Sequence, residues 1–183
     1  MKRISKTTIA AGKWLALSRI TYLAHDGVER TWETVSRNNS NGAIGILATM
    51  KDTGEIILVR QYRPPVDCFV IEFPAGLIDD GESPAEAALR ELREETGYIG
   101  TVSDISSKGY SSPGLTNEYI ILAKVEVDPA NRTDTDFDET ESIETFLVKP
   151  AELNTFLENA RNNGDVIDAK VMAYAFALST VQP

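Results

Sequence analysis

The segment from Gly76 to Tyr98, which reads GLIDDGESPAEAALRELREETGY, most strongly constrains the fold of this chain. It predicts a loop followed by a helix. Ser83 suits the N-cap, Pro84 suits the first helical position, and Glu86 can complete a capping box with Ser83. Gly97 suits the left-handed conformation that often ends a helix. We therefore expect a helix between about residue 83 and residue 97.

This helix is expected to carry two different faces. An apolar stripe recurs at helical spacing and should pack inward; it consists of Ala85, Ala88, Leu89, Leu92 and Thr96. Away from it, Glu91, Glu94 and Glu95 share one patch, where like charges repel unless a cation neutralises them. Carboxylate oxygens suit Mg²⁺, which keeps room for water and phosphate oxygens. The pattern predicts a metal site for phosphate chemistry, and the alternative is a solvated acidic helix face.

The spacing of these residues resembles the Nudix box, G-x₅-E-x₇-R-E-U-x-E-E-x-G-U, in which U is a bulky aliphatic residue. The matching residues are Gly76, Glu82, Arg90, Glu91, Leu92, Glu94, Glu95 and Gly97. The last position holds Tyr98, a departure from the aliphatic pattern. Eight fixed positions make the motif specific. The resemblance implies a mixed α/β fold, the Nudix α/β/α sandwich, whose box helix presents its glutamates at one edge of a mixed sheet.

Composition fits a compact enzyme and excludes several other classes. The chain has 183 residues, of which 42% are hydrophobic, so it can bury a core as one domain with a small appendage. Its formal net charge of −10 argues against a nucleic-acid-binding surface. No apolar run is long enough for a transmembrane helix, so we expect no membrane partner. A single cysteine, Cys68, fits a reducing cytoplasm. The lone histidine, His25, precedes a turn signal and is expected to be exposed and not catalytic.

The order of predicted elements divides the chain into two parts. Residues 14–37 predict an antiparallel hairpin and residues 38–42 a polar hinge, which suggests domains at 1–40 and 41–183. In the second part we expect strands at 43–49, 55–62, 69–74, 101–110, 118–127 and 143–148, an acidic loop at 128–142, and helices at 150–161 and 168–180. Such interleaving implies a mixed sheet covered on both faces. Because an isolated hairpin is marginally stable, it must dock on its own domain or on a partner subunit.

Outside the box, the chain resembles the ADP-ribose pyrophosphatase, or ADP-sugar diphosphatase, branch of the family. The resemblance lies in residues 12–14, 30–37, 60–82 and 111–118, and Pro113 stands sixteen residues after Gly97, where a proline marks ADP-ribose preference in that branch. It implies Mg²⁺-dependent hydrolysis of nucleoside diphosphate sugars, with ADP-ribose yielding AMP and ribose 5-phosphate. A broader range that includes GDP-mannose, and a nucleotide-sensing module without turnover, remain alternatives.

The resemblance also implies metal-binding and catalytic roles. Glu91 and Glu95 correspond to the principal Mg²⁺ ligands, Glu94 bridges or assists, and the backbone carbonyl of Ala75 is a further ligand. Two or three ions are implied, and Mn²⁺ can substitute. Arg90 can hold a glutamate in place through a charge-assisted hydrogen bond. The general base is a box glutamate or a residue of the acidic loop; alignment favours Glu141, with Glu144 and then Glu139 as alternatives. Composition alone would leave this loop solvated and flexible.

Substrate contacts follow from the same resemblance. Arg63 matches an arginine that grips the diphosphate, and Arg37 matches one that helps at the nucleotide. Trp14 and Trp32 match tryptophans that stack on the adenine, one from each subunit of a homodimer with exchanged N-terminal segments. An aromatic face stacked on a base contributes about 1–3 kcal/mol, and the alternative for both tryptophans is core packing. Further expected pocket residues are Glu72, Leu77 and Ser111.

Overall fold

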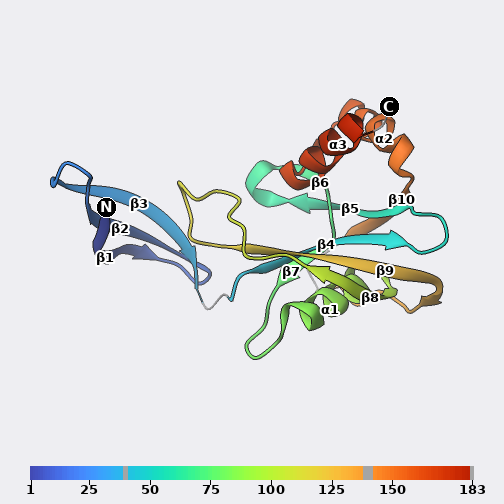
Figure 1. Cartoon of the computed structure of the whole chain (residues 1–183), viewed down its shortest axis with the longest axis horizontal. Helices are drawn as coiled ribbons and strands as arrows, with labels where there is room; N and C mark the ends of the chain where they lie inside the picture. The colour runs from blue at the N-terminus through green and yellow to red at the C-terminus, as the bar shows by residue number, and fades with distance from the viewer. Residues whose placement is uncertain (39–40, 138–141, 182–183) are drawn as a thin grey trace.

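Two β-sheets make up most of the computed structural model, which describes residues 1–38, 41–137 and 142–181. A small sheet at the N-terminus stands to one side of a larger body of strands and helices (Figure 1). The larger body contains an eight-stranded mixed sheet with helices on both faces. The predicted mixed α/β fold with a small antiparallel N-terminal sheet is therefore confirmed.

The small sheet has three antiparallel strands: β1 (Lys2–Ala11), β2 (Leu15–Leu23) and β3 (Glu29–Arg37). The predicted hairpin corresponds to β2 and β3, and its turn contains Gly27 at φ 77° beside an exposed His25. The first strand was not predicted. Every residue of β1 is exposed, so the sequence lacks the alternation of buried apolar residues that marks a strand.

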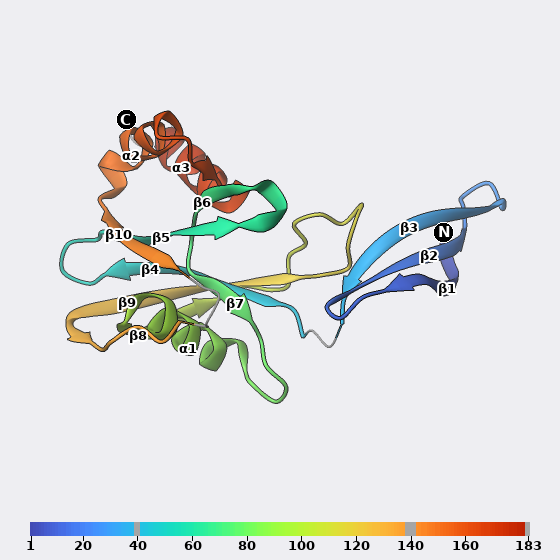
Figure 2. The ribbon, with the colours of Figure 1, turned by 180° about the vertical axis from the view of Figure 1, so that it is seen from behind.

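The small sheet contacts a loop of its own chain. The Val35 amide donates to the Leu115 carbonyl oxygen at 3.0 Å, and the Thr34 hydroxyl donates to the same oxygen at 2.9 Å. Both views show the segment between β8 and β9 reaching toward β3 (Figure 2). These bonds tie the appendage to residues 114–116 of the larger body, so the structure shows docking within one chain.

The large sheet divides between two of its strands. Its members are β4 (Ala43–Met50), β5 (Ile56–Arg63), β6 (Cys68–Glu72), β7 (Ala75–Leu77), β8 (Tyr98–Ile105), β9 (Ile120–Arg132), β10 (Ile143–Val148) and β11 (Val166–Ile167). β4 pairs with β5 only at Thr49 and Ile56, next to their turn. Farther along, β4 pairs with β7 and β9, whereas β5 pairs with β6 and β10. The strands therefore diverge, and β7 lies beside the opening.

A hydrophobic core lies on each face of this divided sheet, between the sheet and the helices that cover it. The helices are α1 (Pro84–Thr96), α2 (Leu153–Asn162) and α3 (Ala169–Val181). α1 packs with β4 and β9 in one core, and α2 and α3 pack with β5 and β6 in the other (Figure 1). β9 shows the expected period of two, because Ile121, Ala123, Val125 and Val127 are buried and the residues between them are exposed. No helix among the described residues is long and apolar enough to cross a membrane.

The helix α1 agrees with its predicted ends but not fully with its predicted face. Ser83 and Glu86 form the capping box, and Gly97 ends the helix at φ 73°. Leu89, however, is exposed, whereas Ala87 is buried together with Ala88 and Leu92. The predicted apolar stripe was therefore wrong at Leu89, because the packing of α1 against β4 and β7 rotates its buried face toward Ala87.

Candidate active site

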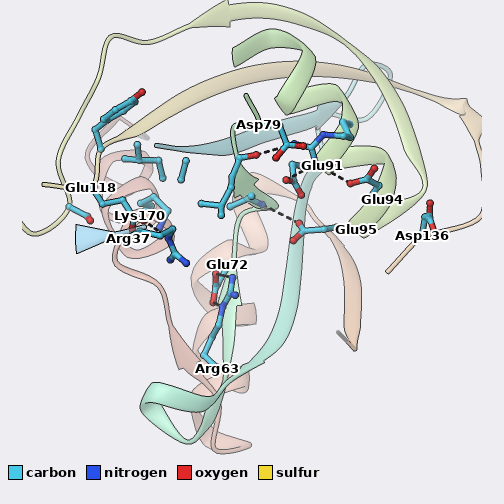
Figure 3. Close-up of a pocket in the computed structure, with 18 residues that line it drawn as sticks. Arg37, Arg63, Glu72, Asp79, Glu91, Glu94, Glu95, Glu118, Asp136 and Lys170 are labelled. Carbon is cyan, nitrogen blue, oxygen red and sulfur yellow. Dashed lines mark hydrogen bonds and ion pairs between the residues drawn. The ribbon is translucent and has the colours of Figure 1, made fainter. Parts of the chain in front are cut away.

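A pocket of about 770 Å³ opens where α1 faces β7 and the ends of β3 and β5 (Figure 3). It gathers ten of the residues that the sequence predicted for the site: Arg37, Arg63, Glu72, Ala75, Leu77, Arg90, Glu91, Glu94, Glu95 and Ser111. These residues come from β3, β5, β6, β7, α1 and the segment before β9, so the fold assembles them from distant parts of the chain.

Arg90 organises the acidic side of the pocket. Its Nη1 donates to Glu91 Oε1 at 2.8 Å and to Glu94 Oε2 at 3.1 Å. Its Nε and Nη2 donate to both Glu82 carboxylate oxygens at 2.9 Å, and Nη2 also donates to the Leu77 carbonyl oxygen. Hydrogen bonding to Arg90 lowers the pKa of Glu82, and the same bonds, with those to Glu91 and Glu94, raise the pKa of Arg90. Arg90 therefore joins α1 to the loop before it and fixes the side chains of three glutamates.

The backbone of β7 lies directly against two of the box glutamates. A Cβ atom built on Gly76 would lie 1.9 Å from Cδ and Oε1 of Glu91, so any side chain at this position would displace the Glu91 carboxylate. The Ala75 amide donates to Glu95 Oε2 at 3.1 Å, and Glu95 is 5% exposed. The turn from β6 into β7 thus brings the main chain of Ala75 and Gly76 to the carboxylates on α1.

The chemistry of this donor set fits a divalent metal such as Mg²⁺. Glu91 and Glu95 are one helical turn apart, both approach β7, and all candidate donors are oxygen atoms, which Mg²⁺ prefers. Their present arrangement is not a closed ligand shell. Within residues 1–38, 41–137 and 142–181, no three acidic, histidine or cysteine side chains are gathered closely enough to hold a metal ion. Arg90 bridges Glu91 and Glu94 in this arrangement.

The opposite side of the pocket carries cations, each beside a carboxylate. Arg63 makes a two-point ion pair with the buried Glu72, with Nε and Nη2 each 2.8 Å from a carboxylate oxygen. Arg37 donates from Nε to Glu118 at 2.7 Å. Figure 3 shows these groups facing the box glutamates across the pocket. The pocket is therefore acidic along α1 and contains guanidinium groups on the other wall, where Arg can bind phosphate oxygens in a fork.

The structure does not bring every predicted residue into this pocket. Trp14 lies in the turn between β1 and β2 and is 65% exposed, and Trp32 lies on β3 and is 53% exposed, so the core-packing alternative was wrong for both. Trp32 donates from Nε1 to the Gly114 carbonyl oxygen at 2.9 Å, three residues from Ser111. Glu141 and Glu139 lie outside the described residues. Glu144 lies on β10, away from the pocket lining, with its carboxylate 3.8 Å from Arg60.

Sequence reasoning missed five polar residues that line the pocket: Asp79, Glu118, Tyr119, Asp136 and Lys170. Asp79 falls inside the box segment, and Glu118 is the last residue of the segment 111–118 that carries the family resemblance, so both could have been found from these motifs. The Asp136 amide donates to the Glu94 carbonyl oxygen, which places the acidic loop against the end of α1. Lys170 had a weaker signal, since it is the single charged residue in residues 169–181.

Comparisons with known proteins agree with this geometry. The NUDIX domain model matches residues 40–172. The chain is 37% identical to the ADP-sugar pyrophosphatase of Mus musculus over 95% of this chain and 85% of the relative. It is 40% identical to the ADP-ribose pyrophosphatase of Saccharomyces cerevisiae, over 89% and 76% respectively. A crystal structure of an ADP compounds hydrolase superposes with a TM-score of 0.74 at 24% identity, over 98% of this chain and 93% of that one.

Proposed function

The chain belongs to the Nudix hydrolase family, and we propose that it hydrolyses the diphosphate bond of ADP-ribose to give AMP and ribose 5-phosphate. One observation carries the proposal most directly: the box glutamates of α1 face Arg37 and Arg63 across a single pocket. A diphosphate needs positive charge around its oxygens, and such a pocket can supply it from both walls once a divalent ion is bound. The similarity to an ADP-sugar pyrophosphatase and an ADP-ribose pyrophosphatase supports ADP-ribose as the substrate.

The residues that would hold the metal are Glu91, Glu94 and Glu95, with the Ala75 carbonyl as a further ligand. When bound, divalent ions neutralise the diphosphate charge and make water more acidic. We propose Mg²⁺ as the ion, in two or three copies, with Mn²⁺ able to substitute. The contacts of Arg90 support this assignment, because they position Glu91 and Glu94 on the pocket side of α1.

The other residues would bind and orient the substrate. Arg63 presents its guanidinium from β5 while Glu72 fixes its orientation through two hydrogen bonds of 2.8 Å. Guanidinium groups fixed in this way stabilise the charge that grows on phosphate oxygens during attack, and they need no rearrangement at that moment. Arg37 would contact the nucleotide side, and Leu77 and Ser111 would line the pocket. The proton of the attacking water would pass to Glu141 or to a box glutamate such as Glu94.

The small N-terminal sheet is proposed to provide the base-binding aromatics. Exposed indole rings can stack on a purine, and the Nε1 hydrogen bond to Gly114 holds the ring of Trp32 beside the loop that carries Ser111. We further propose that residues 1–40 act as a separate domain from 41–183, in a cytoplasmic homodimer with exchanged N-terminal segments and one tryptophan from each subunit. Sedimentation velocity of the full chain tests the dimer, since a monomer at working concentration would contradict it.

Turnover measurements test the substrate. Phosphate release coupled to a monoesterase is measured with Mg²⁺ and ADP-ribose, GDP-mannose or UDP-glucose. Glu95→Gln should lower kcat by about a hundredfold or more with a smaller change in KM, because the lost carboxylate acts mainly in the transition state. Glu158→Gln, an exposed change on α2, is the matched control. Comparable rates on all three substrates would indicate a broad-range hydrolase, and ADP-ribose binding without turnover would indicate a nucleotide sensor.

A further inference from the structure

The first turn of α3 brings a cation into the pocket that the Nudix box does not include. We propose that Lys170 is a substrate-binding residue whose ammonium group contacts the diphosphate of the nucleotide sugar together with Arg37 and Arg63. The proposal rests on the proposed function and extends it to the C-terminal helix. Lys170 lines the same pocket as the box glutamates, and Figure 3 shows it on the wall that carries Arg37.

Strand pairing explains how a residue near the C-terminus reaches this wall. β11 pairs in parallel with β6, with Val166 opposite Val70 and Ile167 opposite Ile71. The next amide, of Asp168, donates to the Ile71 carbonyl oxygen at 3.0 Å. Ile71 immediately precedes the pocket residue Glu72. The start of α3 is therefore attached to the strand that supports the Arg63–Glu72 pair.

The position of Lys170 within α3 is unfavourable for helix stability. It occupies the first turn, where the positive end of the helix dipole disfavours a cation. The remaining residues of α3 carry no charge, so the lysine has no ion-pair ladder along the helix. Asp168 already accepts the Lys170 amide at 2.8 Å through Oδ1, and this cap needs no ammonium group. A charge placed against the dipole and toward a pocket is therefore better explained by an anionic ligand than by the stability of α3.

The local contacts leave the ammonium group able to bind such a ligand. Lys170 Nζ lies 2.8 Å from the Asp168 carboxylate oxygens, and its side chain is 28% exposed. An ammonium group has three donors, so contact with one carboxylate does not use them all. Asp168 fixes the direction of the side chain much as Glu72 does for Arg63 and Glu118 does for Arg37. The three cations, from β3, β5 and α3, therefore have the same arrangement: a neighbouring carboxylate positions each of them at the pocket wall.

Variants that remove only the ammonium group test the proposal. Lys170→Met keeps the aliphatic stem and the backbone cap, and we expect KM for ADP-ribose to rise about tenfold or more while the melting temperature stays unchanged. Lys170→Arg should retain most of the affinity. Asp168→Asn keeps an oxygen acceptor for the Lys170 amide and leaves the ammonium group in place, so we expect it to raise KM less than Lys170→Met, by the loss of the orienting carboxylate alone. Lys149→Met is the matched control, because Lys149 forms an exposed ion pair with Glu152 outside the pocket.

The outcomes separate this proposal from the proposed function. If the wild type turns over ADP-ribose and Lys170→Met has an unchanged KM, the role of Lys170 is wrong and the function stands. If Lys170→Met and Asp168→Asn lower the melting temperature alike with KM unchanged, the pair is structural and the proposal is overturned. If the wild type binds ADP-ribose without turnover, calorimetric titration replaces kinetics, and a tenfold loss of affinity in Lys170→Met supports the lysine while the hydrolase function fails. A wild type that neither binds nor hydrolyses ADP-ribose overturns both.

Discussion

A methyl group at Gly76 should displace one of the proposed metal ligands. In Gly76→Ala, the new Cβ would lie 1.9 Å from Cδ and Oε1 of Glu91, whereas real Cβ contacts essentially never fall below 3.0 Å. The Glu91 carboxylate must therefore move by about 1 Å or more. It cannot move freely, because Arg90 holds Oε1 at 2.8 Å and the side chain is 14% exposed. A misplacement of about 1 Å at a catalytic group can lower the rate about a hundredfold.

The same clash should reduce stability by a measurable amount. Inserting a methyl group into a closely packed site costs about 1–3 kcal/mol, which for a chain of this size corresponds to roughly 2–12 °C in melting temperature. The clash has one identified partner, so the cost should disappear when that partner is shortened. We therefore expect Gly76→Ala to cost much less in a Glu91→Ala background than in the wild type.

Kinetics and thermal unfolding of four proteins test this reasoning: the wild type, both single variants and the double variant. Gly109→Ala is the matched control, because a Cβ there would meet its nearest atom at an ordinary 3.7 Å. We expect Gly76→Ala to lose kcat/KM for ADP-ribose by about a hundredfold, and Gly109→Ala to keep it. Full activity in Gly76→Ala would refute the displacement of Glu91. An equal stability loss in the Glu91→Ala background would show that the cost arises elsewhere.

Four further results are expected. Gly97→Ala should destabilise by about 2–4 kcal/mol in urea unfolding, because φ is 73° and a Cβ would lie 2.4 Å from the Thr133 carbonyl oxygen, whereas Gly164→Ala, at φ 92° in open space, should cost only about 1 kcal/mol. Arg90→Lys should lower kcat/KM about a hundredfold, because lysine cannot reproduce the fork to three glutamates, and wild-type kinetics would contradict its role. Trp32→Phe should raise KM less than Trp32→Ala if stacking matters more than the bond to Gly114. EDTA should abolish turnover and weaken ADP-ribose binding measured by calorimetry, and added Mg²⁺ should restore both.

The parts of the fold that were predictable depend on local signals. The ends of α1 follow from a capping box and a C-terminal glycine, which act within a few residues of the helix. The burial of Ala87 in place of Leu89 depends on how α1 lies against β4 and β7, which no local pattern specifies. β1 was not predicted because a strand in which every residue is exposed has no apolar periodicity to detect. Exposed edge strands of small appended sheets are therefore difficult to predict from sequence patterns.

The candidate site likewise contains residues that a local pattern predicts and residues that depend on long-range contacts. Glu91, Glu94 and Glu95 fall within five residues on one helix, so their proximity follows from helical geometry. Lys170 follows Glu72 by almost a hundred residues, and only the pairing of β11 with β6 brings α3 to the pocket wall. The docking of β3 on the Leu115 carbonyl is equally non-local. Contacts of this kind depend on the topology of the whole sheet. A sequence motif can therefore indicate the chemistry of a site without identifying every residue that lines it.

The pairing of every pocket cation with a carboxylate has a consequence for how an anionic substrate can bind. Arg37, Arg63 and Lys170 are each matched by an acid, so their charges are largely compensated before any ligand arrives. The α1 side adds further carboxylates, and Arg90 compensates only part of them. A diphosphate approaching this pocket alone would meet net negative charge and a desolvation cost. Favourable binding therefore requires additional positive charge on the glutamate side. The metal is then needed for substrate affinity as well as for the chemical step. The carboxylate partners orient the cations and also reduce the non-specific binding of other anions to the pocket.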